Sequence, residues 1–141
     1  SFGEIEKRNL QIVLNVPEKP VMVRTDGRRM WRVIENIYNN AAKYALEGTR
    51  VYADLIEKEH TVEFSLKNIL EQPLNISADE LTDGLPGDVS RSTEGSGLGL
   101  SIAKNLTELQ GGKFELYLDG DLFKVTIVFP KAVVGQSVTK S

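Results

Sequence analysis

The chain has 141 residues, the size of one domain, and its 40% hydrophobic and 26% charged residues are ordinary for a globular protein. This composition excludes a disordered tail and a collagen-like repeat, and the absence of cysteine excludes thiol catalysis and a cysteine-built metal site. A formal net charge of −3 without a basic run argues against electrostatic binding of nucleic acid, and no apolar run approaches the ~20 residues of a membrane span.

The first third of the chain predicts two short strands and a long helix. Residues 1–9 are mostly polar and are expected to be a tail or a chain boundary, while the apolar patterns of 10–16 and 21–24 predict strands. Asp26 has the residue type of an N-cap, and the helix that it begins should run to about Ala45. Spacings of four, three and four residues define its apolar face, which consists of Met30, Ile34, Ile37 and Ala41.

Two alternating strands are predicted next, at 51–55 and 62–67, around a turn that contains His60. We expect His60 to be a solvated loop residue, and a single histidine excludes a histidine-rich metal site. Residues 69–94 are irregular and contain several turn residues. A stretch of that length in a compact domain is typically functional or mobile.

The last third of the chain predicts a helix and a closing hairpin. The helix should begin within 95–99 and end at Gly111-Gly112, with an inward face made of Leu98, Ile102, Leu106 and Leu109. Alternation at 114–118 and 123–129 predicts two strands joined by a turn at Asp119-Gly120. Together the elements predict an α/β fold, a two-layer sandwich of a mixed, mostly antiparallel sheet with helices on one face.

Asn36, Asn40 and Lys43 share one face of the predicted long helix, because they lie at i, i+4 and i+7. Asparagine is a middling helix former, so two amides one turn apart suggest a function. Amide oxygens can contact a hard cation and an ammonium group can contact an anion, and magnesium with a polyphosphate would satisfy all three side chains. A solvated polar face is the alternative that the spacing leaves open.

Three glycines precede the last predicted helix, in the run Gly95-Ser96-Gly97-Leu98-Gly99-Leu100. Glycines let a backbone approach phosphate closely, and the free N–H groups at the start of a helix favour an anion. The run is not a dinucleotide fingerprint, since no strand leads directly into it, and it is not a P-loop, since no Gly-Lys-Ser/Thr follows. A flexible hinge would have the same composition.

The two motifs together resemble those of sensor histidine kinases. The run Asn36-Ile37-Tyr38-Asn39-Asn40-Ala41-Ala42-Lys43-Tyr44 is similar to their asparagine box, and the run from Gly95 to Lys104 is similar to their second glycine box. The order and spacing of the boxes agree, as do the strand pair between them and the closing hairpin. The resemblance covers about residues 10–130 and implies the Bergerat-type ATP-binding fold and the catalytic domain of a bacterial two-component histidine kinase.

This resemblance implies a domain at 10–131 with an ATP lid at about 69–94 and a C-terminal tail at 132–141. Asn40 would ligate Mg²⁺ against the phosphates of ATP, with Asn36 in support. Two cationic side chains, Lys43 and Arg91, would contact the phosphates, and these two with Asn40 are the implied catalytic residues. The remaining implied contacts to the nucleotide are Tyr44 near adenine or ribose, and Gly95, Ser96, Gly97, Leu98, Gly99 and Leu100 around its phosphate tail.

The sequence departs from the family pattern at the predicted base-reading residue. The family's first glycine box has an aspartate followed by two glycines, whereas Asn68 is followed here by Ile69-Leu70-Glu71-Gln72. An amide can still accept from the amino group of adenine and donate to the adjacent ring nitrogen. Thr126 matches a threonine that helps the base-reading residue in related folds, and we expect it to lie beside Asn68.

The implied function is that of a protein-histidine kinase domain that binds ATP and Mg²⁺. It would present the γ-phosphate to a histidine on a dimerisation domain outside this chain and act on a response regulator through that domain. The implied location is the cytoplasmic part of a membrane-anchored kinase, with no direct membrane contact by this fragment.

Two alternatives belong to the same fold. A water-activating ATPase or a serine kinase of the anti-sigma type would need a glutamate base four residues before the magnesium ligand, where this chain has Asn36. A degenerate nucleotide-sensing or partner-docking module, with little kinase activity, is suggested by the missing glycines after Asn68.

Overall fold

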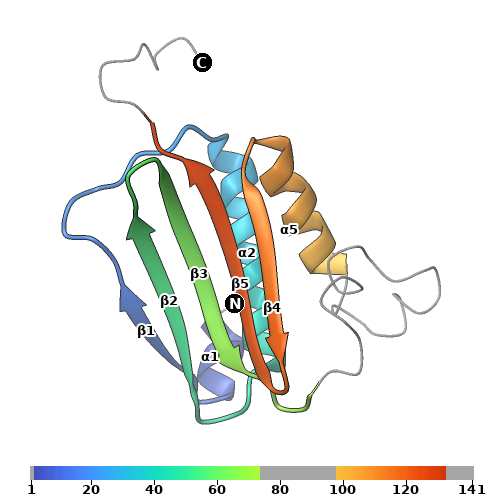
Figure 1. Ribbon diagram of the computed structural model, residues 1–141. Helices are drawn as coiled ribbons and strands as arrows, with labels where there is room; N and C mark the ends of the chain where they lie inside the picture. The colour runs from blue at the N-terminus through green and yellow to red at the C-terminus, as the bar shows by residue number, and fades with distance from the viewer. Residues whose placement is uncertain (1, 74–97, 133–141) are drawn as a thin grey trace.

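A five-stranded sheet with helices against one face forms the fold in the computed structural model, which describes residues 2–73 and 98–132 (Figure 1). The described helices are α1 (Phe2–Lys7), α2 (Gly27–Tyr44) and α5 (Leu98–Leu109). The strands are β1 (Gln11–Asn15), β2 (Arg50–Glu57), β3 (Thr61–Ile69), β4 (Lys113–Asp119) and β5 (Leu122–Pro130). The predicted α/β class is confirmed.

The strand order is β1-β2-β3-β5-β4, and the connections explain which pairs are parallel. β1 and β2 run parallel because the connection through α2 returns the chain to the end of the sheet at which β1 began. All the other neighbouring pairs are antiparallel. Short turns connect β2 to β3 and β4 to β5, so the sheet is mixed and mostly antiparallel, as predicted.

Alternation along the strands separates a core face from an open face. On β5 the residues Phe123, Val125, Ile127 and Phe129 are buried and pack in the core with residues of α2 and α5. Their neighbours on β5 are half-buried and lie on the other face of the sheet. The core therefore occupies the layer between the sheet and the two long helices, and the opposite face of the sheet carries no helix among the described residues.

Polar contacts at its N-terminal end help to fix the position of α2. The Asp26 carboxylate accepts from the backbone N–H groups of Arg28 and Arg29, at 2.9 and 3.3 Å, which confirms the predicted N-cap. The backbone N–H of Asp26 donates to Oε1 of Gln110 at 2.7 Å, just after the end of α5. α5 therefore ends beside the start of α2, and the two helices run antiparallel, as Figure 1 shows.

A glycine ends α5, as predicted. Gly111 has a φ of 82°, and its N–H donates to the carbonyl of Glu108 while the N–H of Gly112 donates to that of Thr107. These two bonds form a Schellman motif, which satisfies carbonyl groups that the helix itself leaves free.

Three local predictions are wrong. Residues 2–7, expected in a tail, form α1, and Ile5 of this helix packs against the core. The predicted strand at 21–24 is reduced to one isolated bridge between Val23 and Lys131. The hairpin turn lies one residue later than predicted, because Asp119 still pairs with Leu122 and Gly120 adopts a φ of 61°.

The inward face of α5 agrees with the prediction only in part, because Leu106 packs against the core as expected but other residues differ. Its buried residues are Leu100, Ala103 and Thr107, whereas Leu109 is 64% exposed. The prediction followed the largest apolar side chains, whereas the buried side chains of α5 include the small Ala103 and the polar Thr107. The predicted boundaries at 69–94 and 132–141 fall mostly outside the described residues.

We predict that Gly112→Ala destabilises the fold. A Cβ atom at residue 112 would lie 2.6 Å from Cε1 of Phe129, whose ring is buried in the core. Overpacking of this kind costs about 1–3 kcal/mol, which urea unfolding would detect as a lower free energy of unfolding. Gly27→Ala is the matched control, because a Cβ there meets no atom within 4 Å. Equal stability of the two variants would contradict the prediction.

Candidate nucleotide-binding site

The C-terminal half of α2 presents the predicted polar residues in different environments. Asn40 is buried at 8% exposure, Asn36 is half-buried and Lys43 is exposed. A solvated polar face does not explain the burial of Asn40, because burial removes an amide from water. Tyr44, one turn further along, packs against the core. On this face of α2, Lys43 is therefore in contact with solvent, whereas Asn40 lies in the protein interior.

Asn68 is the second buried amide of the predicted site. It lies near the end of β3, directly opposite Phe123 of β5, so its side chain is on the core face of the sheet. The side chain is 2% exposed. Its Nδ2 donates to the backbone carbonyl of Ile69 at 3.4 Å, whereas Oδ1 has no hydrogen-bond partner in the described part of the protein. A buried acceptor without a donor is rare in proteins, so Oδ1 is the atom of this side chain with which a donor from a ligand would pair.

Backbone bonds join the end of α2 to the end of β3. The N–H of Leu46 donates to the carbonyl of Ile69 at 2.8 Å, and the N–H of Glu71 donates to the carbonyl of Tyr44 at 2.9 Å. An antiparallel bridge between Ala45 and Leu70 lies between these two bonds. The connection places the buried end of β3, with Asn68, beside the helix that carries Asn40.

The chain fills the space of the family's first glycine with a core side chain. Leu70, which occupies that position, is 3% exposed and belongs to the main hydrophobic cluster. Its N–H donates to the carbonyl of Asp121 at 2.7 Å, in the turn between β4 and β5. Leu70, which replaces the family's glycine, is therefore well packed in the core. The backbone around it is held by hydrogen bonds to the β4–β5 turn and to the end of α2.

The start of α5 contributes the described part of the second glycine box. Leu98 and Gly99 form the first turn of α5, and this end of the helix lies at the same end of the molecule as the C-terminus of α2, because the helices are antiparallel (Figure 1). Leu100 is 1% exposed and belongs to the core, so only its backbone is available to a ligand. The other predicted residues of this region, Arg91, Gly95, Ser96 and Gly97, lie outside the described residues.

The predicted contact between Thr126 and Asn68 is wrong. Thr126 pairs with Ser65 of β3 and Glu115 of β4, three residues away from the partner of Asn68. Side chains alternate along a strand, so Thr126 lies on the open face of the sheet and Asn68 on the core face. The observed contact of the Asn68 amide is the backbone carbonyl of Ile69.

Sequence reasoning missed Arg8, which it assigned to the tail. The Arg8 guanidinium donates to the carbonyl of Ala45 at 3.0 Å and lies 3.5 Å from a carboxylate oxygen of Glu71. It thus contacts both chain segments that join α2 to the end of β3. No spacing or motif in the sequence signals this contact, because it joins residues 37 and 63 positions apart.

The residues of the site lie in a region of the chain that is similar to a known protein family. The model of the family "Histidine kinase-, DNA gyrase B-, and HSP90-like ATPase" matches residues 25–133. The chain belongs to this family. The match includes α2, the end of β3 and α5, which carry the described site residues. The predicted resemblance to the ATP-binding catalytic domain of a sensor histidine kinase is confirmed.

Curated relatives are sensor kinases. The chain is 34% identical to the sensor protein KdpD of Clostridium acetobutylicum, over 85% of this chain and 14% of KdpD. It is 32% identical to the adaptive-response sensory kinase SasA of Prochlorococcus marinus, over 84% of this chain and 34% of SasA. The chain therefore spans well under half the length of these relatives.

A solved structure shares the fold. The catalytic domain of the histidine kinase ThkA superposes with a TM-score of 0.74 at 21% identity, and the match covers 92% of this chain and 84% of that one. None of the described helices is long and apolar enough to cross a membrane.

We predict that removing the unpartnered oxygen of Asn68 stabilises the protein without nucleotide. Asn68→Leu keeps a similar shape, and a buried unsatisfied polar atom costs about 1–3 kcal/mol, so the free energy of unfolding in urea should rise by roughly 1 kcal/mol. The Ile69 carbonyl stays paired, because it also accepts from Leu46.

Thr107→Val is the matched control for this prediction. Thr107 is fully buried on α5, and its Oγ1 also has no partner in the described part of the protein. Both variants should gain stability, but only Asn68→Leu should lose ATP binding. Destabilisation by Asn68→Leu alongside stabilisation by Thr107→Val would show that Asn68 has a partner in the free protein.

Proposed function

We propose that ATP binds between the C-terminal half of α2, the end of β3 and the start of α5, and that this domain presents its γ-phosphate to a histidine on another domain of the same kinase. The carrying observation is Oδ1 of Asn68, which is buried, faces the helical layer and has no partner in the described part of the protein. Family membership supplies ATP as the nucleotide.

The amide of Asn68 would read the base. Its Nδ2 donates to the Ile69 carbonyl, which leaves Oδ1 as the atom available to a ligand. The 6-amino group of adenine is a donor that this oxygen can accept from, whereas guanine carries an oxygen at the same position. Discrimination against GTP therefore rests on the two oxygen acceptors, Oδ1 of Asn68 and the 6-oxygen of guanine, which cannot form a hydrogen bond with one another.

The polar face of α2 would hold the phosphates. Asn40 would contact Mg²⁺ through its amide oxygen, supported by Asn36, and the exposed ammonium group of Lys43 would contact a phosphate oxygen. When bound, Mg²⁺ offsets the negative charge of the phosphates. Arg91 and the residues 95–97 are proposed to complete the contacts, and the lid assigned to 69–94 remains a prediction.

Phosphoryl transfer needs little chemistry from the protein beyond positioning and charge stabilisation. The imidazole nitrogen of the acceptor histidine would attack the γ-phosphorus while the bond to the bridging oxygen of ADP breaks, and the imidazole would release its proton to solvent. No general base is required on α2. Asn36 lies where an ATPase of this fold would carry its glutamate, and Glu35 is exposed about 100° away around the helix. This arrangement favours a histidine kinase over a water-activating ATPase.

The wider context of the chain is also a proposal. The relatives are sensor proteins far longer than this chain, so we propose that a dimerisation domain carries the acceptor histidine and that a response regulator receives the phosphoryl group. Because ATP is a cytoplasmic substrate, this domain would act on the cytoplasmic side of a membrane-anchored kinase.

We predict that Asn40→Ala removes most of the magnesium dependence of ATP binding. The substitution deletes the proposed amide ligand, and titration calorimetry with and without Mg²⁺ measures the effect. Asn39→Ala is the matched control, since Asn39 is exposed on the same helix. Unchanged magnesium dependence in Asn40→Ala, with its unfolding curve intact, would show that Asn40 is not the ligand.

Base selectivity provides a separate prediction for Asn68. The parent chain should bind ATP roughly ten- to a hundredfold more tightly than GTP, because a mispaired buried amide costs about 1–3 kcal/mol. Asn68→Ala should lose most of this preference, and Asn68→Asp should keep it because a carboxylate also accepts from adenine. Equal affinities of the parent for ATP and GTP would refute base reading by Asn68.

A further inference from the structure

Arg8 has a fixed place in the fold, because it lies in the turn that ends α1. The N–H of Leu10 donates to the carbonyl of Ile5 at 3.0 Å, and the N–H of Asn9 donates to the carbonyl of Glu6 at 3.1 Å. With Asn9 at a φ of 55°, these bonds form a Schellman motif around Arg8. Leu10 belongs to the main hydrophobic cluster and Ile5 packs against it, so this turn is held against the core of the domain.

The side chain of Arg8 extends from this turn to the junction of α2 and β3. Its Nη1 donates to the carbonyl of Ala45 at 3.0 Å and lies 3.5 Å from Oε2 of Glu71. Ala45 is the C-cap of α2, and the last carbonyls of a helix have no partner within it. A cation at this end of α2 satisfies one such carbonyl and is favoured by the helix dipole. The bond to Ala45 is the stronger contact, because the Glu71 side chain is 57% exposed and water weakens an exposed ion pair.

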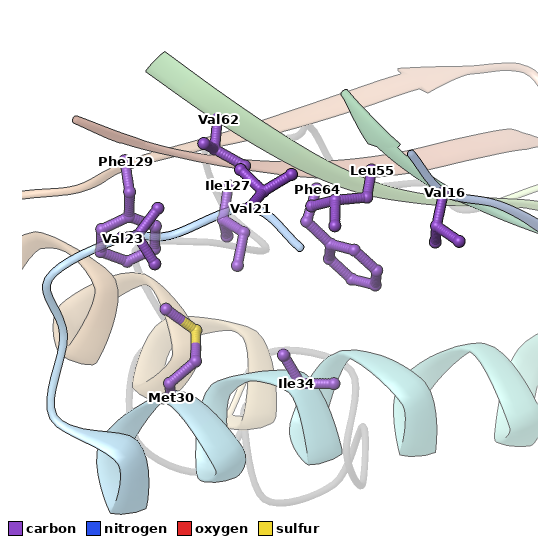
Figure 2. Close-up of a pocket in the computed structure, with 10 residues that line it drawn as sticks. All are labelled: Val16, Val21, Val23, Met30, Ile34, Leu55, Val62, Phe64, Ile127 and Phe129. Atoms are coloured by element: carbon purple, nitrogen blue, oxygen red, sulfur yellow. The ribbon is translucent and has the colours of Figure 1, made fainter. Parts of the chain in front are cut away.

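The packing of α2 against the sheet is uneven along the helix. At its N-terminal end an apolar cavity of about 340 Å³ lies between the helix and the sheet, and Figure 2 shows Met30 and Ile34 facing sheet residues such as Phe64 across it. A void removes packing contacts from the side chains that line it. The backbone contact of Asp26 with Gln110 ties this end to α5 and not to the sheet. The position of α2 relative to β3 is therefore set mainly towards its C-terminal end.

We propose that Arg8 is a positioning residue for the nucleotide site and couples α1 to ATP binding. This role rests on the proposed function, in which one nucleotide contacts both Asn40 of α2 and Asn68 of β3. ATP can satisfy both amides at once only if their separation matches the distance from the adenine to the phosphates. Arg8 contacts the segment that follows each amide, so it holds that separation. By linkage, bound ATP stabilises the same contacts and holds α1 more tightly against the junction.

A residue that only capped α2 would behave differently. Loss of a cap lowers the free energy of unfolding but leaves the nucleotide affinity of the folded molecules unchanged. Loss of a positioning contact lowers the affinity of folded molecules, most of all for a ligand that uses both amides. ATP is such a ligand, whereas GTP gains no hydrogen bond from Oδ1 of Asn68 and can adjust its position on the polar face of α2. The ratio of the two affinities therefore distinguishes positioning from capping.

Arg8→Met tests this role, because it removes both contacts and keeps an unbranched side chain. We would measure the dissociation constants of ATP and GTP by titration calorimetry, under conditions where urea unfolding shows the variant to be folded. ATP binding should weaken about five- to tenfold and GTP binding less than about twofold. Arg8→Lys keeps the charge and a donor for the Ala45 carbonyl, so it should weaken ATP binding only about twofold.

Arg50→Met is the matched control for the loss of charge. Arg50 is exposed and begins β2, at the end of the sheet where β3 carries Asn68. Its removal changes the net charge by the same amount as Arg8→Met, and this variant should bind ATP as the parent does. Arg8→Gln, which is shorter but polar, replaces Arg8→Met in every comparison if the methionine variant does not fold, with the same expected direction.

Amide hydrogen exchange measures the junction directly. The N–H groups of Leu46 and Glu71 make its two backbone bonds, whereas the N–H of Gly112 bonds at the end of α5. Arg8→Met should speed exchange at Leu46 and Glu71 roughly fivefold and leave Gly112 unchanged. In the parent, ATP should slow exchange at the two junction amides, and this slowing should be smaller in Arg8→Met.

The positioning role is overturned if Arg8→Met binds ATP as tightly as the parent, if its ATP and GTP affinities fall by the same factor, or if Arg50→Met weakens ATP binding as much. Faster exchange at the junction with unchanged ATP affinity would make Arg8 a helix cap only. Failure of the parent to bind ATP, or to prefer it to GTP, would refute the proposed function, and the positioning role with it.

Discussion

The connection between the end of α2 and the end of β3 is the constraint on which the proposed nucleotide site depends. Hydrogen bonds from Leu46 to Ile69 and from Glu71 to Tyr44, on either side of the Ala45–Leu70 bridge, hold a helix end against a strand end. Asn40 lies within one or two turns of this connection, and Asn68 immediately precedes it. Arg8 contacts the same two segments from α1. A shift of this junction would move both buried amides relative to one another.

Asn68 departs from the general trend of the interior. A buried polar group is normally satisfied by the protein itself, because an unpaired one has lost water without compensation. Asn68 keeps one oxygen unpaired in the described part of the fold, at 2% exposure. Binding sites commonly store such local instability, since a ligand that supplies the missing donor recovers it. The surrounding core, including Leu70 at the family's glycine position, would hold that oxygen in place.

α2 has different chemical character at its two ends. Its C-terminal half carries the buried amide of Asn40, whereas its N-terminal end carries exposed arginines and the exposed Trp31. The contact of Gln110 with the backbone of Asp26 ties this N-terminal end to α5, whose opposite end belongs to the glycine box. The packing of α5 along α2 therefore holds both ends of this helix in place.

The sequence by itself determined the family and the helices and strands of the described regions, apart from the missed α1 and a strand wrongly predicted at 21–24, because periodicity, the Asp26 cap and the two motifs are local signals. It also located Asn36, Asn40 and Lys43 on one helical face. Alternation showed that Asn68 and Thr126 each lie on one side of a strand, but only strand register and sheet packing decided that these sides are opposite. The inward face of α5 was likewise decided by tertiary packing, which buries Leu100, Ala103 and Thr107 and leaves the larger Leu109 exposed. The unpaired oxygen of Asn68 and the contacts of Arg8 depend on segments distant in sequence, so only the tertiary structure could reveal them.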